Sequence, residues 1–301
     1  MGSASNGPTS RDYCSEMILH LLGIVLTIAF TLFCTLLPFL PGSYDNNAVA
    51  LSEMAHMFGI VGLLLVPVGL LWIGAERSSR LAQKGHAFPL FALIASTLVW
   101  ASLCLAAIMH SGLVLAFAVV LIWLLVVRKA WARFRQGASP ARSSASLARS
   151  SAIPFYLIAV PIAVALLQWA LVDRAIEMSR NRAIANSAPL IAAIEEYRNK
   201  NGRYPTSLLA EHPDIRPQVM GIREYRYEPH GAAYNLVFEQ FNYRFGTREF
   251  VVYNPLDEHV MTAHTIDILE MTPEQLIVER TRGHYSRHDL PQAHWKYFWF
   301  D

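Results

Sequence analysis

Long apolar stretches separated by short polar segments fill the first half of the chain. A helix needs about 20 apolar residues to cross the hydrocarbon core of a bilayer, and most of these stretches reach that length. The fourth stretch, residues 112–127, is shorter and is separated from the third, residues 87–109, only by His110-Ser111-Gly112. We therefore expect these two stretches to form a tight helical hairpin. The pattern predicts a four-helix transmembrane region over 17–127 and a fifth span; the stretches are 17–41, 54–75, 87–109, 112–127 and 153–172.

The segments that flank these stretches are polar. Residues 1–16 are rich in Ser, Gly and Asn without periodicity, which predicts a disordered cytoplasmic tail. The first apolar stretch is longer than the core of a signal peptide, which has about 7–15 residues, and no A-x-A-like site follows it. We therefore expect an uncleaved span. Residues 128–152 are basic and rich in Ser and Ala, which predicts a flexible cytoplasmic linker.

Lysine and arginine are unevenly distributed among the loops. Residues 42–53 and 110–112 contain none, whereas the loops after the second and fourth stretches carry Arg77, Arg80, Lys84, Arg128, Lys129, Arg133, Arg135, Arg142 and Arg149. Because cytoplasmic loops are enriched in these residues, the N-terminus and both basic loops are expected in the cytoplasm. Residues 173–301 then form a periplasmic or extracytoplasmic domain on a protein of the bacterial inner (plasma) membrane.

The first part of this domain has a helical pattern. Apolar residues recur near the helical period between Asp173 and Lys200, which predicts an amphipathic helix that covers a sheet. Pro189 interrupts the pattern: either Ser187 caps a new helix with Pro189 in its first turn, or one continuous helix kinks there. Gly202 supplies a left-handed stop after the helix.

Aromatic and β-branched runs follow. Residues 222–228 and 234–239 predict a β-hairpin, with Tyr234, Leu236 and Phe238 on one face. A third run at 248–253 predicts another strand, and 259–269 is a further strand with vague boundaries. Residues 271–281 fit either a short helix or a strand. The sequence therefore predicts an α-helical membrane bundle followed by an α+β domain with a long N-terminal helix on an antiparallel sheet.

A family resemblance is carried by the run Ala188–Thr206, APLIAAIEEYRNKNGRYPT. It resembles the end of the long helix in type IV pilins and in the major pseudopilins of type II secretion. The resemblance implies a pilin-like fold whose structural turn is formed by Tyr197, Asn201, Gly202, Tyr204 and Pro205. Unlike a pilin subunit, the chain has no glycine before Phe155 and no carboxylate within 153–172. We therefore expect a permanently tethered module, and the first four spans have no counterpart in that family.

Composition agrees with a membrane protein: 53% of the residues are hydrophobic and 16% charged, with a mean hydropathy of +0.29. The formal net charge of +2 gives no argument for nucleic acid, and the basic-aromatic run Arg128–Arg135 is explained as a positive-inside anchor. Cys14, Cys34 and Cys104 leave no cysteine for a disulfide in the domain. The apolar stretches contain no Asp, Glu, Lys or Arg, which disfavours an ion-coupled carrier.

Histidines are the main candidates for chemistry. His284 and His288 are four residues apart, but the nearby Gly, Ser and Pro residues disfavour the helix that a metal site would need, and a solvated His-rich tail is expected. A loose group of Asp257, His259 and His264 matches no standard ligand spacing. His56 and His110 sit at outer ends of spans, where paired haem ligation is the alternative to ordinary boundary positions. We expect no metal and no cofactor.

The C-terminal aromatic run leaves three interpretations open. It is an edge strand buried on the sheet, an interfacial segment in the bilayer, or a partner-docking peptide formed by Trp295, Tyr297, Phe298, Trp299 and Phe300. No phosphate-binding loop or nucleophile motif occurs in the chain. The sequence favours a non-enzymatic membrane protein that binds envelope proteins, in pilus or secretion-system assembly. The alternative is a membrane-embedded redox protein or enzyme that binds metal or haem through outer-face histidines.

Overall fold

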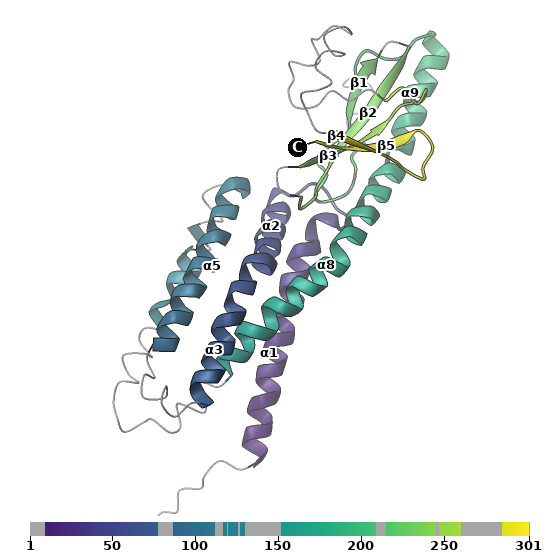
Figure 1. Cartoon of the computed structure of the whole chain (residues 1–301). Helices are drawn as coiled ribbons and strands as arrows, with labels where there is room; N and C mark the ends of the chain where they lie inside the picture. The colour runs from purple at the N-terminus through teal and green to yellow at the C-terminus, as the bar shows by residue number, and fades with distance from the viewer. Residues whose placement is uncertain are drawn as a thin grey trace, which may run out of the picture. The chain divides into compact units, whose positions relative to one another are not determined.

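The structure is a computed structural model, and it describes residues 10–77, 87–111, 117–118, 120–125, 127–129, 152–208, 215–230, 232–244, 247–259 and 285–300. It divides into two compact units. The helical unit contains residues 1–35 and 50–171, and the sheet unit contains residues 36–49 and 172–301 (Figure 1). Each unit is described by itself.

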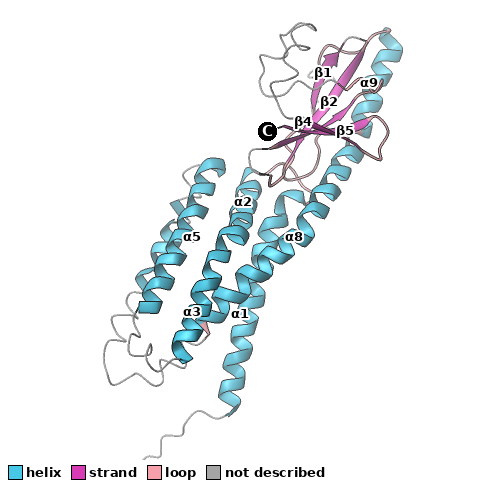
Figure 2. Cartoon of the chain, in the orientation of Figure 1, coloured by secondary structure: helices cyan, strands magenta, loops and turns pink. Residues whose placement is uncertain are grey.

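The described elements of the helical unit are helices (Figure 2). Three of the described helices are long and apolar enough to span a membrane, and they cover Met17–Phe39, Asn46–Gly74 and Ile153–Asn201; Phe91–Leu105 is a shorter apolar helix. The elements are α1 (Ser10–Leu36), η1 (Leu37–Phe39), α2 (Asn46–Val61), η2 (Gly62–Leu64), α3 (Leu65–Arg77), α5 (Ala87–Ser111) and α8 (Ile153–Asn186). The predicted fourth span and the basic linker lie largely outside the described residues. The parts of them that are described and helical are 117–118, 120–125 and 127–129.

Two helices begin earlier than their apolar patterns indicate. α1 starts at Ser10, so the prediction of a disordered tail is wrong for residues 10–16, while residues 1–9 are not described. α2 starts at Asn46, because the Asp45 carboxylate accepts a hydrogen bond of 2.8 Å from the Asn47 backbone N–H and caps the helix. As a consequence, Glu53 lies inside the helix and not in the preceding loop.

Pro67 explains the interruption between α2 and α3. A proline lacks the N–H that would bond to the carbonyl one turn earlier, and its ring clashes with that carbonyl. The chain accommodates this with the 3₁₀ turn η2, directly before α3, in which Pro67 is the third residue. Pro161, in contrast, lies inside the uninterrupted α8.

A buried polar network joins three helices of the helical unit. Gln168 of α8 is 3% exposed, and its amide donates to Thr35 Oγ1 of α1 and to the Ala55 carbonyl of α2, both at 2.9 Å. Ser52 Oγ of α2 donates to the Thr35 carbonyl. Gly59 leaves the room that the Gln168 side chain needs, since a Cβ at this position would collide with the amide oxygen. Hydrogen bonds of this kind hold apolar helices in register.

The sheet unit contains a five-stranded antiparallel sheet of order β1-β2-β3-β5-β4. The strands are β1 (Arg226–His230), β2 (Ala233–Gln240), β3 (Arg248–Tyr253), β4 (Tyr285–Asp289) and β5 (Trp295–Phe300). The predicted hairpin is confirmed as β1 and β2, although β1 begins four residues later than the predicted 222–228 and includes Pro229 and His230 of the expected turn. The predicted strand 248–253 is β3. The strand expected from residue 259 onward and the segment 271–281 lie outside the described residues, apart from His259, which is not in a strand.

One face of the sheet packs on helix. The end of α8 and the following α9 (Ala188–Asn201) contribute apolar side chains to a core with the sheet face that carries Tyr234, Leu236 and Phe238, as the alternation predicts. The other face has its own buried cluster of Val237, Phe250, Val252 and Phe298. A new helix does start at Ala188 with Pro189 in its first turn, but Ser187 makes no side-chain cap. Its hydroxyl donates backwards to the Ile184 carbonyl at 2.7 Å.

Residues 36–49, between the first two helices, belong to the sheet unit. Pro41 forms an isolated antiparallel bridge with Val219. Phe39 is 6% exposed and its ring lies 5.7 Å from that of Phe241, measured between centroids. This strap adds backbone pairing and apolar contact to the domain, and the hydropathy pattern contains no sign of it.

Candidate functional site

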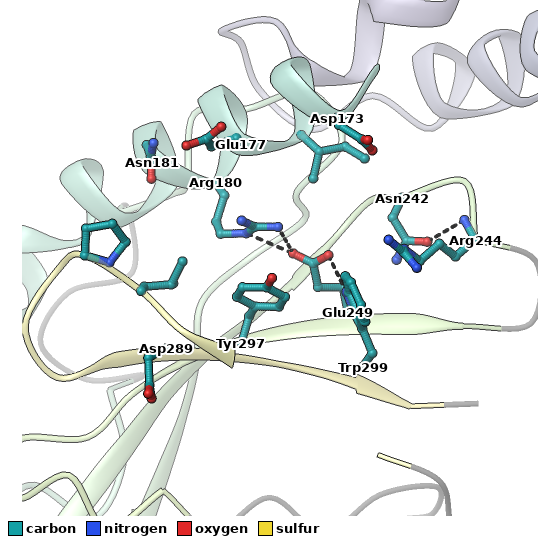
Figure 3. A pocket seen from close by; sticks show the side chains of 13 residues that line it. Asp173, Glu177, Arg180, Asn181, Asn242, Arg244, Glu249, Asp289, Tyr297 and Trp299 are labelled. Atoms are coloured by element: carbon teal, nitrogen blue, oxygen red, sulfur yellow. Dashed lines mark hydrogen bonds and ion pairs between the residues drawn. The ribbon is translucent and has the colours of Figure 1, made fainter. Parts of the chain in front are cut away.

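A polar cleft of about 370 Å³ lies in the sheet unit, between the start of the polar part of α8 and the strands β3 and β5 (Figure 3). Its helical side spans Asp173 to Asn181. This volume is at the lower end of the range for pockets that bind small molecules. The cleft is the strongest candidate for a site among the residues that the structure describes.

The floor of the cleft is a buried ion pair. Glu249 is 2% exposed and Arg180 is 8% exposed. Arg180 Nε donates to Glu249 Oε1 at 2.9 Å, and the second carboxylate oxygen accepts a 2.9 Å hydrogen bond from Trp299 Nε1. Because both charges are removed from water, their mutual bonds offset a large desolvation cost. The charges of Arg180 and Glu249 therefore neutralise each other, and the hydrogen bonds hold both side chains in place.

Aromatic rings form one wall, and charged or imidazole groups cover them. The Arg180 guanidinium lies 4.3 Å from the centroid of the Tyr297 ring, and His288 stacks on Tyr297 at 4.6 Å with 12° between the planes. The Arg244 guanidinium lies 3.8 Å from the centroid of Trp299. These contacts use the π faces that a ligand cation would otherwise occupy.

The rim presents charges of both signs. Asp173 and Glu177, one turn apart on α8, are exposed and form no ion pair with any described residue. Across the cleft, the Arg244 side chain has no carboxylate partner within the described residues and lies on Trp299. Asp289 pairs with Lys296 at 2.9 Å, and the hydrogen bond from Lys296 lowers the pKa of the Asp289 carboxyl.

The predicted turn is structural. α9 ends at Asn201, whose side-chain amide donates to the Tyr197 carbonyl at 2.9 Å. Gly202 follows at φ 71°, a left-handed conformation, and its N–H donates to the Arg198 carbonyl. Pro205 is buried, and its carbonyl accepts a 2.7 Å hydrogen bond from the Tyr227 hydroxyl.

Tyr204 attaches the turn to the sheet. Its ring packs edge-on against Tyr234 with 4.9 Å between centroids, and its hydroxyl bonds to Glu195 at 3.2 Å and to Arg198 at 2.7 Å. Burial, followed by the Glu195 charge, raises the pKa of Tyr204. Burial also raises the pKa of Tyr227, to about 12. These residues hold the helix end on the sheet and leave no open site.

The C-terminal aromatic run is an inner strand. β5 pairs with β3 on one side and β4 on the other, and Trp295 and Phe298 are 5% and 2% exposed. The interpretation as a strand buried on the sheet is confirmed, but its placement at the edge is wrong, because both backbone edges of β5 are already paired. Partner docking through this run stays a prediction. Only Tyr297 and Trp299 of this run line the cleft.

The prediction of a solvated tail around His288 is also wrong, because this residue lies in β4 and stacks on Tyr297. Asp257 meets His294 at 3.0 Å, a pair that the sequence did not suggest. Within the described residues no group of three or more His, Cys, Asp or Glu is arranged to hold a metal ion. His264 and His284 lie outside those residues, as does the side chain of His110, so the proposed pairing with His56 is not tested.

Sequence reasoning missed the floor of the cleft, although a signal was present. Arg180 falls on the apolar stripe of its helix, between Ile176 and Ala183, and Glu249 falls on the same strand face as Val251. A charge on each of two surfaces that must pack together predicts a buried pair. That inference needed the pairing of one helix with one strand, which periodicity alone does not supply.

Comparison with family models, with curated proteins and with solved structures gives no match. The resemblance to pilins therefore rests on the sequence pattern of Ala188–Thr206.

Proposed function

We propose that this protein is a multi-pass membrane protein that holds a pilin-like domain outside the cytoplasm, where the domain binds envelope proteins in pilus or secretion-system assembly. The observation that carries the proposal is the continuity of α8. This helix of 34 residues begins in the apolar segment at Ile153 and ends at Asn186, among residues that pack on the antiparallel sheet. A helix with an apolar first half and a sheet-covering second half is the plan that the pilin resemblance implies.

The strap supports the proposed orientation. The loop 42–53 contains no Lys or Arg, which supports a position outside the cytoplasm by the positive-inside rule. Its residues up to Val49 belong to the same compact unit as residues 172–301. This grouping supports a position of both segments on the same side of the membrane, and the charge pattern gives independent support for the outer side.

The tether distinguishes this chain from a pilin subunit. The resemblance implies that a pilin subunit inserts into a filament, whereas this domain is joined to further helices long and apolar enough to span a membrane and is bound by the strap through the Pro41–Val219 bridge. We infer that it acts from a fixed position, through the edge strands β1 and β4.

Alkaline phosphatase fusions test the orientation. A fusion after Asp301 is expected to be active and a fusion after Pro140 inactive, because the enzyme folds only outside the cytoplasm. The reverse pattern would refute the proposed topology.

Site-specific photocrosslinking tests the binding function. A photoreactive residue at Arg287 on β4 or Arg226 on β1, both exposed, is expected to capture a pilin or secretion-system component in native membranes. The same residue at the exposed Asn199 of α9 is the matched control. Equal yields at all three positions, or adducts with lipid only, would count against binding through the sheet edges.

A further inference from the structure

The cleft lies close to the membrane boundary of α8. The apolar part of this helix, residues 153–172, is roughly 20 residues long and extends about 30 Å, which matches the hydrocarbon core. Trp169 is 84% exposed one turn before the end of this part, as is typical of side chains in the aromatic belt. The polar part starts at Asp173, the first helical residue of the cleft.

Helical geometry sets the depth of the rim. Each residue advances about 1.5 Å along the axis, so Asp173 and Glu177 lie within about 8 Å of Val172. The polar layer on each side of the hydrocarbon core is about 5–8 Å thick. The rim carboxylates therefore fall at the depth of lipid headgroups.

From this position and the charges on the rim, we propose that the cleft binds the phosphoethanolamine headgroup of a membrane phospholipid. The carboxylates of Asp173 and Glu177 accept hydrogen bonds from the primary ammonium group. Across the cleft, the Arg244 guanidinium binds the phosphate, and its position over Trp299 limits the side-chain entropy that is lost on binding. Arg180 and Glu249 neutralise each other and form the floor of the cleft. The charges on the rim therefore determine which headgroup binds.

The same geometry selects against the other common headgroups. Choline lacks N–H donors and binds by contact with open aromatic faces. Here Tyr297 lies between Arg180 and His288, and Arg244 covers Trp299. An anionic glycerol headgroup has no ammonium for the two rim carboxylates, which would repel its charge.

The test uses the full-length protein in nanodiscs. The discs contain phosphatidylcholine alone, or phosphatidylcholine mixed with phosphatidylethanolamine or with phosphatidylglycerol. After release into mild detergent, intact-mass spectrometry counts the lipid retained on each chain. We expect one phosphatidylethanolamine per chain, with no comparable retention of the other two lipids.

Variants locate the bound lipid. Arg244→Gln, and Asp173→Asn combined with Glu177→Gln, are each expected to weaken retention about tenfold, because each removes one end of the zwitterion's contacts. Arg203→Gln and Glu224→Gln remove exposed charges outside the cleft and should retain the lipid fully. An unchanged melting temperature in all four proteins shows that folding is not the cause.

Three outcomes overturn the proposal. The first is equal retention of phosphatidylethanolamine and phosphatidylcholine, and the second is full retention by the cleft variants. The third is strong binding of free phosphoethanolamine. This compound, added to phosphatidylcholine discs, is expected to bind weakly because it lacks the acyl chains that hold the lipid at the cleft. Binding of the free compound as strongly as the membrane lipid would assign the cleft to a soluble ligand instead.

Discussion

The buried pair of Arg180 and Glu249 makes a quantitative prediction about the stability of the sheet unit. Glu249→Gln keeps the size of the side chain and an oxygen for the Trp299 N–H, but it leaves the Arg180 guanidinium buried without a counter-charge. Breaking a buried pair from one side costs about 3–5 kcal/mol. The carboxylate is 2% exposed, so water cannot replace the lost partner.

This cost converts into a shift of the melting temperature. For a unit of roughly 140 residues, 1 kcal/mol corresponds to about 3–5 °C, so Glu249→Gln is expected to lower the transition by about 10–25 °C. Arg180→Met combined with Glu249→Gln removes both charges and keeps the Trp299 bond. The double variant should therefore be more stable than Glu249→Gln alone.

Glu239→Gln supplies the matched control. Glu239 pairs with Arg248 at 2.7 Å, but the two side chains are 47% and 59% exposed, so the pair contributes about 0–1 kcal/mol. Thermal unfolding of the full-length variants in detergent, followed by near-ultraviolet circular dichroism, compares them. Equal shifts for the two Glu→Gln variants, or a double variant less stable than Glu249→Gln, would refute the assignment of a buried, mutually compensated pair.

Further predictions concern the turn, the tyrosines and the helical unit. Gly202→Ala should destabilise the sheet unit by about 1–2 kcal/mol, since φ is 71° there, and Gly202→Asn by less; chemical denaturation compares them. Burial raises the pKa of Tyr227 to about 12, whereas an unfolded tyrosine titrates near 10, so the melting temperature should hold below about pH 10 and fall as the pH approaches 12. Tyr227→Phe should reduce this alkaline loss, and an unchanged profile contradicts the burial argument. Gly59→Ala should lower thermal stability by displacing the Gln168 amide, and adding Gln168→Ala should restore part of it; additive losses would contradict the contact.

Local sequence patterns predicted an element well where residues of one kind, such as apolar, glycine or β-branched residues, determine its conformation. The apolar run from Ile153 marks the start of α8, and the stop at Gly202 follows from the left-handed conformation that glycine tolerates. β3 coincides with its predicted range because β-branched and aromatic residues fill it. Helix starts set by hydrogen bonds were missed, as at Asp45, because hydropathy does not register a cap.

The predictions failed where a segment depends on partners far along the chain. β4 contains Ser, Arg, His and Asp and has little strand character, yet it pairs along β5 and places His288 on Tyr297. The C-terminal run has strong strand character, but its place inside the sheet depends on pairing with β3 and β4. Strand order is a property of the assembled sheet, and no local pattern encodes it.

By itself, the sequence determined the apolar helices, the helix stop at Gly202 and the alternating face of β2, because each depends on neighbours within a few residues. Only the tertiary structure decided that the loop after the first helix is a strap on the sheet unit, and that the C-terminal strand is internal. It also brought Arg180 and Glu249 together as the floor of a cleft whose rim continues from the end of an apolar helix. These features join residues dozens of positions apart, and their energies exist only once the chain has closed the loops between them.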